Sequence, residues 1–144
     1  MKVREAMTPD VRVARPDQSI CEAARMMAEC DAGSLPVGDD DHLVGVITDR
    51  DIAIRAVAEG KSPETLIRDV MSNEVLYCFE DEDTEEVARN MGDNKVRRLP
   101  VLSRSKQLVG IVSIGDLALS SDLDTTGEAL ADISTPGGAH SQTA

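Results

Sequence analysis

The chain has 144 residues, enough for one compact domain, and 27 acidic against 15 basic residues give it a formal net charge of −12. That charge would repel a phosphate backbone, and one Tyr, one Phe and no Trp leave almost no ring on which a base could stack, which argues against nucleic acid as a partner. No apolar run approaches the roughly 18 residues that a membrane span needs, and the first five residues lead into no signal-peptide core. We therefore expect a cytoplasmic protein without a membrane partner.

The first half of the chain predicts a strand, a helix, a hairpin and a second helix. The predicted bounds are a strand over residues 11–13, a helix between Ser19 and Gly33, strands over 34–37 and 43–47, and a helix over about 49–59. Ser19 stands three residues before Glu22, as in a capping box, and apolar residues follow at helical spacing. A polar turn separates the two β-rich runs, which is typical of a hairpin.

The second half predicts the same β-α-β-β-α order. Its predicted bounds are a strand over residues 75–79, a helix capped by Asp83 and Glu86, and strands over 99–102 and 108–112. Between the halves, Ser62 as N-cap and Pro63 at the first helical position predict a short helix that reaches Met71. From about residue 121 Ser, Thr, Gly and Ala dominate, which predicts a mobile tail with room for a brief helix over 128–133.

The two halves are copies of one unit. Matching positions are Met7 and Met71, Arg25 and Arg89, Leu35-Pro36-Val37 and Leu99-Pro100-Val101, and Asp51 and Asp116. We divide the chain into repeat 1 (residues 1–60), a linker (61–66), repeat 2 (67–120) and the tail (121–144). Each copy is too small to bury its own apolar face alone, so the two should share a core. A doubled position is then either a packing device used twice or a site present twice.

The order of the doubled motifs resembles a known family. Each copy has Met-Thr or Met-Ser near its start, Leu-Pro-Val on one strand, and Gly, two apolar residues and Thr/Ser-x-x-Asp on the next. Over residues 3 to about 120 this resembles the CBS (cystathionine beta-synthase) domain pair, or Bateman module, of the stand-alone bacterial or archaeal type. The resemblance implies an α+β fold of two repeats packed sheet to sheet around a pseudo-twofold axis. It also implies a homodimer, and clefts for an adenosine compound such as AMP, ADP, ATP or S-adenosylmethionine.

Two strand-to-helix turns are the strongest candidate binding positions. Thr48 and Asp51 stand where a strand ends and a helix begins, and Ser113 and Asp116 repeat the pair. The free N–H groups of a helix start attract anions, a hydroxyl can meet a phosphate, and a carboxylate can accept two ribose hydroxyls. The same spacing is also that of a capping box, which is the competing interpretation. The family resemblance favours ligand contact at one turn or both.

The copies differ just before Leu-Pro-Val, where the second has Arg97 and Arg98 and the first has Gly33 and Ser34. The resemblance implies that basic residues here contact a nucleotide phosphate. The alternative is a solvated or ion-paired Arg pair on an acidic protein. Arg50 could act similarly, although its claim as an exposed first-turn residue is weaker.

Other polar groups have simpler explanations. The acidic run from Asp39 to His42 fills a hairpin turn and lacks the spacing of a metal site, so we predict no metal. The two histidines, His42 and His140, are not placed to serve a nucleophile, so we predict no catalytic residue and no enzyme activity. Cys21, Cys30 and Cys78 are best explained as plain thiols, with a redox sensor as the alternative.

The sequence thus indicates a non-catalytic regulatory protein that needs no cofactor. It would bind an adenosine-type small molecule and signal through its conformation or through an unidentified protein partner. Two alternatives stay open: a structural or stress-related interaction protein of the same fold that binds no ligand, and a thiol-based redox sensor.

Overall fold

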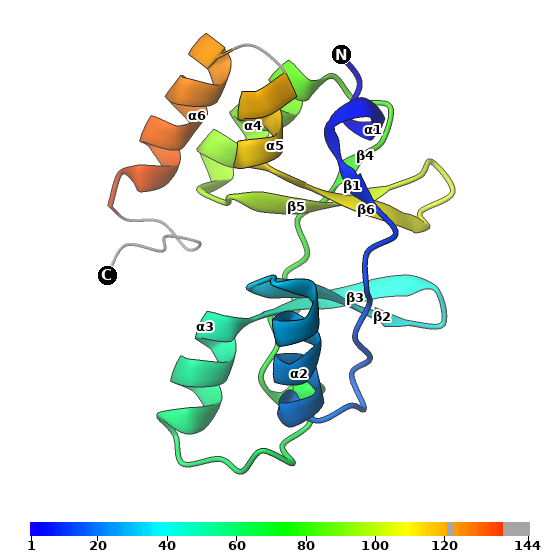
Figure 1. The fold of residues 1–144 in the computed structure, drawn as a ribbon, viewed down its shortest axis with the longest axis vertical. Helices are drawn as coiled ribbons and strands as arrows, with labels where there is room; N and C mark the ends of the chain where they lie inside the picture. Colours follow the sequence, from blue (N-terminus) through cyan, green and yellow to red (C-terminus); the bar gives the residue numbers. More distant parts are fainter. Residues whose placement is uncertain (121–122, 137–144) are drawn as a thin grey trace. The chain divides into compact units, whose positions relative to one another are not determined.

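The computed structural model describes residues 1–120 and 123–136 (Figure 1). It is a mixed α+β structure, as predicted, and its chain forms two compact units. One unit consists of residues 12–75. The other combines residues 1–11 with the chain from residue 76 onward.

The unit of residues 12–75 is built on one hairpin. Its elements are α2 (Ile20–Cys30), β2 (Ser34–Asp39), β3 (His42–Thr48), α3 (Asp49–Asp51), the π-helical turn η1 (Ile52–Val57) and the 3-10 turn η2 (Ile67–Asp69). Strands β2 and β3 pair antiparallel, and single bridges at Ala14 and Ser72 extend the sheet on its two sides. Helix α2 and the α3–η1 segment lie on the same face of the hairpin (Figure 1). The fully buried side chains between them include Leu35, Val37 and Ile47.

The other unit repeats this arrangement. Its elements are α1 (Val3–Ala6), β1 (Thr8–Pro9), β4 (Cys78–Phe79), α4 (Thr84–Asn94), β5 (Arg98–Leu102), β6 (Leu108–Ser113), α5 (Ile114–Ser120) and α6 (Leu123–Ser134). Its four-stranded sheet has the order β1-β6-β5-β4, with β4 parallel to β5 and the other pairs antiparallel. Helices α4 and α5 cover one face of this sheet (Figure 1). Leu99, Val101 and Val112 are buried beneath them.

The opening segment of each repeat packs in the unit formed by the rest of the other repeat. A Cβ built on Gly110 would stand 2.7 Å from the Thr8 carbonyl oxygen and 2.7 Å from the Met7 sulfur. A Cβ on Gly45 would likewise stand 2.6 Å from the Ser72 carbonyl oxygen. The doubled Met-Thr/Ser motif and the doubled glycine therefore form one contact that occurs in each unit. The opening segment can come this close to the strand only where the strand residue has no side chain.

The two outer strands are shorter than predicted. No strand forms over residues 11–13, where only Ala14 makes a bridge with Val37, and the strand predicted over 75–79 is limited to Cys78–Phe79. The cause is the proline of each Leu-Pro-Val motif. Pro36 and Pro100 carry no N–H, so the carbonyls of Arg12 and Leu76 lack the donor that would continue a parallel ladder.

The predicted helix starts were right in one case and wrong in another. The Ser19 hydroxyl accepts the Glu22 N–H at 3.1 Å, so the predicted cap is confirmed. Asp83 makes no side-chain cap. Its carboxylate instead lies 3.6 Å from the N-terminal amine, which belongs to the same unit. The short helix predicted from Pro63 to Met71 is reduced to the single 3-10 turn Ile67–Asp69.

The predicted mobile tail is wrong over its first half. Residues Leu123–Ser134 form helix α6, which packs along α4 with Ala129 and Ile133 buried. The Lys95 ammonium group donates to the Thr135 carbonyl at 2.7 Å and holds the helix end. The brief helix allowed over residues 128–133 lies within α6, and composition concealed the rest of it, because its buried face is narrow and many of its other residues are small or polar. The rest of the predicted tail, residues 121–122 and 137–144 with His140, lies outside the described residues.

Candidate functional site

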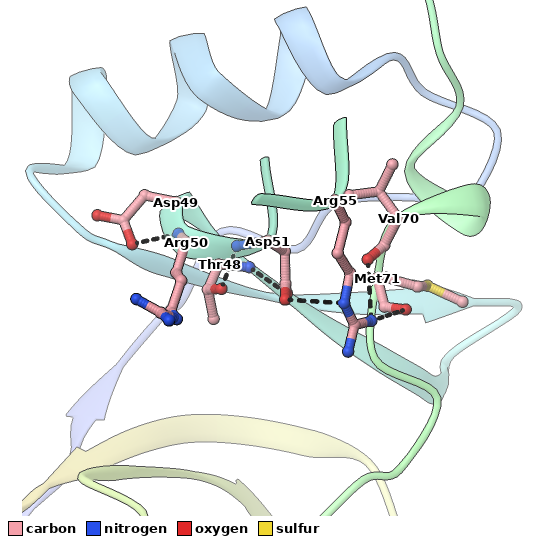
Figure 2. Close-up of polar contacts among 7 residues, drawn as sticks. All are labelled: Thr48, Asp49, Arg50, Asp51, Arg55, Val70 and Met71. Atoms are coloured by element: carbon pink, nitrogen blue, oxygen red, sulfur yellow. Dashed lines mark hydrogen bonds and ion pairs between the residues drawn. The ribbon is translucent and has the colours of Figure 1, made fainter. Parts of the chain in front are cut away.

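The first strand-to-helix turn lies between β3 and α3. The Thr48 N–H donates to Asp51 Oδ2 at 3.0 Å, and the Asp51 N–H donates to Thr48 Oγ1 at 3.0 Å (Figure 2). Both side chains are half-buried. The two predicted residues are therefore together, and their contacts are those of the capping box that spacing alone predicted.

The second turn, between β6 and α5, has the same geometry. The Ser113 N–H donates to Asp116 Oδ2 at 2.9 Å, and the Asp116 N–H donates to Ser113 Oγ at 3.0 Å. In both turns capping uses the Oδ2 atom, so the Oδ1 atom of each carboxylate takes no part in it. A carboxylate has about four acceptor positions, so capping does not exhaust either group.

Arg55 distinguishes the first turn from the second and was missed in the sequence. Its Nε lies 3.8 Å from Asp51 Oδ1, and its Nη1 donates to the Val70 carbonyl at 3.3 Å and to the Met71 carbonyl at 3.4 Å (Figure 2). The Asp–Arg spacing of four residues was a readable signal of this ion pair. In the second copy the matching residue is Ser120, whose hydroxyl donates to the Asp116 carbonyl at 2.6 Å.

Arg97 and Arg98 lie beside the second turn. The Arg97 carbonyl accepts the Ile114 N–H at 2.9 Å, and Arg98 pairs with Ser113 in the β5–β6 register. Both arginines are exposed. Neither guanidinium forms an ion pair or a hydrogen bond with another residue of the described chain, which leaves both forks open to an anion.

At the position that matches Arg97, the first copy has Gly33, with the Asp49 carboxylate beside it. A Cβ built on Gly33 would stand 3.0 Å from the Asp49 carboxylate, so the glycine leaves room for that group. Asp49 Oδ1 accepts the Arg50 N–H at 2.8 Å (Figure 2). The Arg50 side chain is exposed and has no partner among the described residues. The first turn thus carries an extra carboxylate where the second turn has two arginines.

The remaining candidates contribute little to this site. Among the described residues no group of three or more His, Cys, Asp or Glu side chains could hold a metal ion. All three cysteines are free thiols, with Cys30 exposed and Cys78 buried. Burial, and secondarily the charge of Glu82, raises the pKa of Cys78 to about 12, so this thiol is not a reactive thiolate. In the described part of the chain, no helix has both the length and the apolar character of a membrane span.

Comparison with known proteins identifies the same family that the sequence motifs resemble, and the match covers most of the chain. The CBS domain model matches residues 3–57 and again 67–121. The CBS domain-containing protein YhcV of Bacillus subtilis is 38% identical over 133 residues, which cover 92% of this chain and 94% of YhcV.

Solved structures match as well. The CBS domain pair of protein MJ0100, in complex with 5'-methylthioadenosine and S-adenosylmethionine, has a TM-score of 0.74 at 30% identity and covers 83% of this chain and 94% of its own. CBSX2 in complex with AMP has a TM-score of 0.71 at 28% identity, with the same two coverages. Both repeats match the CBS domain model, and in both the strand glycine packs against the opening segment of the other repeat. The chain therefore belongs to the CBS domain family.

Proposed function

We propose that this protein is a non-catalytic regulatory CBS protein that binds an adenosine-containing ligand, such as AMP, ATP or S-adenosylmethionine, at one or both of its strand-to-helix turns. The observation that carries the proposal is the second turn. There the Asp116 carboxylate keeps Oδ1 outside its cap, and two exposed arginines without partners lie at the start of the adjoining strand, Arg97 just before β5 and Arg98 as its first residue. The structures of MJ0100 and CBSX2 with adenosine compounds support the choice of ligand class.

The chemistry of the turn suits a nucleotide. The Asp116 carboxylate can accept ribose hydroxyls, and the guanidinium forks of Arg97 and Arg98 match phosphate oxygens. The acidic net charge does not oppose this, because charges beyond about 8 Å are screened at physiological ionic strength while an Arg–phosphate pair acts at contact distance.

A thermal-shift panel with AMP, ADP, ATP, NAD and S-adenosylmethionine tests the proposal. A ligand at one hundred times its Kd adds about 2.7 kcal/mol, which raises Tm by several degrees in a domain of this size. The matched variant is Asp116→Asn, which keeps an oxygen acceptor for the cap and removes the charge. Absence of a shift with every compound would contradict nucleotide binding and favour a ligand-free interaction protein.

A second comparison separates the two arginines from the carboxylate. The double variant Arg97→Ala/Arg98→Ala should weaken AMP binding and leave binding of 5'-methylthioadenosine, which carries no phosphate, within about twofold of wild type. Equal losses with both compounds would show that the arginines support the fold of the site rather than the phosphate.

The regulatory output would pass through a homodimer or a protein partner. Ile54 and Leu119 occupy matching positions of the two copies and are 51% and 92% exposed, which is unusual for such side chains. A protein contact would cover them. Light scattering of wild type and of Leu119→Glu tests this: we expect a dimer that weakens in the variant, and a monomeric wild type would contradict the homodimer and favour a different protein partner.

A further inference from the structure

The two turns share their cap and differ in what faces the remaining carboxylate oxygen. In the first, the Arg55 guanidinium lies 3.8 Å from Asp51 Oδ1 (Figure 2). In the second, Ser120 replaces the arginine and turns its hydroxyl to a backbone carbonyl of its own helix. Among the described residues, Asp116 has no cationic partner. The repeat therefore contains one carboxylate that is already paired and one that is not.

Arg55 is held at the first turn by three polar contacts. Its Nη1 contacts two backbone carbonyls, those of Val70 and Met71, in addition to the ion pair through Nε. With a guanidinium beside Oδ1, this oxygen is a poorer acceptor for a neutral hydroxyl, because the hydroxyl must fit next to the guanidinium and compete with the ion pair for the carboxylate charge. Displacing Arg55 would also leave the two carbonyls without their donor.

We propose that Arg55 is a specificity-determining residue that closes the first turn to a ribose, so that the protein binds its adenosine ligand at the second turn alone. This inference rests on the proposed function and deepens it. Residues beside the two turns support the same conclusion independently of Arg55. Asp49 adds a negative charge over Gly33, which directly precedes β2, whereas Arg97 holds the matching position directly before β5. The first turn sets Asp49 and Asp51 against Arg50 and Arg55, whereas the second sets Asp116 alone against Arg97 and Arg98, so a phosphate would be attracted more strongly at the second turn.

Isothermal titration of AMP into the full chain tests the inference through stoichiometry. Wild type should bind one AMP per chain, and Asp116→Asn should weaken that binding at least tenfold. Asp51→Asn should leave it within twofold. Arg55→Ser, which gives the first copy the residue of the second, should add a second and weaker binding event. The double variant Arg55→Ser/Asp51→Asn should return to one.

Arg25→Ser is the matched control, since it removes the same charge from an exposed helix position in the same unit. It should keep one site. Because the Asp51→Asn and Asp116→Asn arms do not depend on Arg55, the inference stays testable if Arg55→Ser fails to fold.

The outcomes separate the two proposals. Two equal sites in wild type, or equal losses in Asp51→Asn and Asp116→Asn, would overturn the role of Arg55 and leave nucleotide binding standing. If Arg55→Ser binds one AMP as wild type does, the ion pair does not close the first turn. If neither wild type nor any variant binds AMP or another compound of the panel, the proposed function fails and this inference fails with it.

Discussion

Gly92 on α4 lies against the backbone of Ala129 on α6: a Cβ built on Gly92 would stand 3.2 Å from the Ala129 Cα and 3.1 Å from Asp132 Oδ2. The matching residue of the first copy is Ala28, which is exposed on α2. The second copy therefore lacks a Cβ at the point where a neighbouring helix approaches α4. This contact explains why α6 packs on the second copy's helix.

Gly92→Glu should loosen α6. The larger side chain cannot fit against Ala129, and overpacking of this kind costs about 1 to 3 kcal/mol. Urea unfolding should show the loss, and hydrogen exchange should show faster exchange within α6. Gly127→Ala is the control, because no atom lies within 4 Å of a Cβ at Gly127 and alanine is the better helix former. Slow exchange in α6 of Gly92→Glu would contradict the contact.

Gly45→Ala and Gly110→Ala should each destabilise the protein by about 1 to 3 kcal/mol, since a methyl group at either position meets a carbonyl oxygen at less than 3.0 Å. Backbone cannot move aside as a side-chain tip can. Chemical denaturation measures the loss. If either variant is as stable as wild type, the opening segment does not cross that strand as closely as the structure shows.

Cys78 should make stability fall in alkaline solution. Burial raises its pKa from 9.0 to about 12, so the unfolded chain releases this proton near pH 9 and the folded protein holds it. The contribution is complete below pH 9 and is lost as the pH rises toward 12. Denaturant unfolding at pH 8 and pH 10.5 should show a smaller decrease for Cys78→Ala than for wild type. Cys30→Ala, at an exposed thiol, should keep the wild-type decrease; a Cys78→Ala protein with the same decrease would contradict the assignment.

Arg104→Gln should raise the pKa of Asp81. The Arg104 Nε contacts both Asp81 oxygens at 3.0 and 2.9 Å, and these hydrogen bonds, followed by the charge of the guanidinium, hold the Asp81 pKa below its ordinary value. Whatever stability the pair contributes is present above the ordinary carboxyl pKa and is lost as the pH falls through the lowered one. NMR titration of the carboxyl carbon measures the pKa. Arg89→Gln should leave it unchanged, and an unchanged value in Arg104→Gln would show that other groups lower it.

The hairpins and the two capped turns could be predicted because their signals are local. Alternating apolar residues around a polar turn, and Thr48 three residues before Asp51, depend on residues close in the chain. The lengths of the outer strands could not be predicted from their own composition. They depend on Pro36 and Pro100 of the neighbouring strands, which have no backbone N–H to donate to them. Arg55 was missed for a related reason: the carbonyls that fix it come from residues 15 and 16 positions further along.

The sequence by itself determined the repeat, the family and the doubled strand-to-helix turns, since these follow from the order of residues. The tertiary structure alone decided which segment packs against which. It set Met7 and Thr8 of one repeat against Gly110 of the other, and placed α6 on α4. The physical reason is that such choices depend on atoms far apart in the chain, where a missing Cβ or a fixed guanidinium acts only once the fold has brought its neighbour within reach.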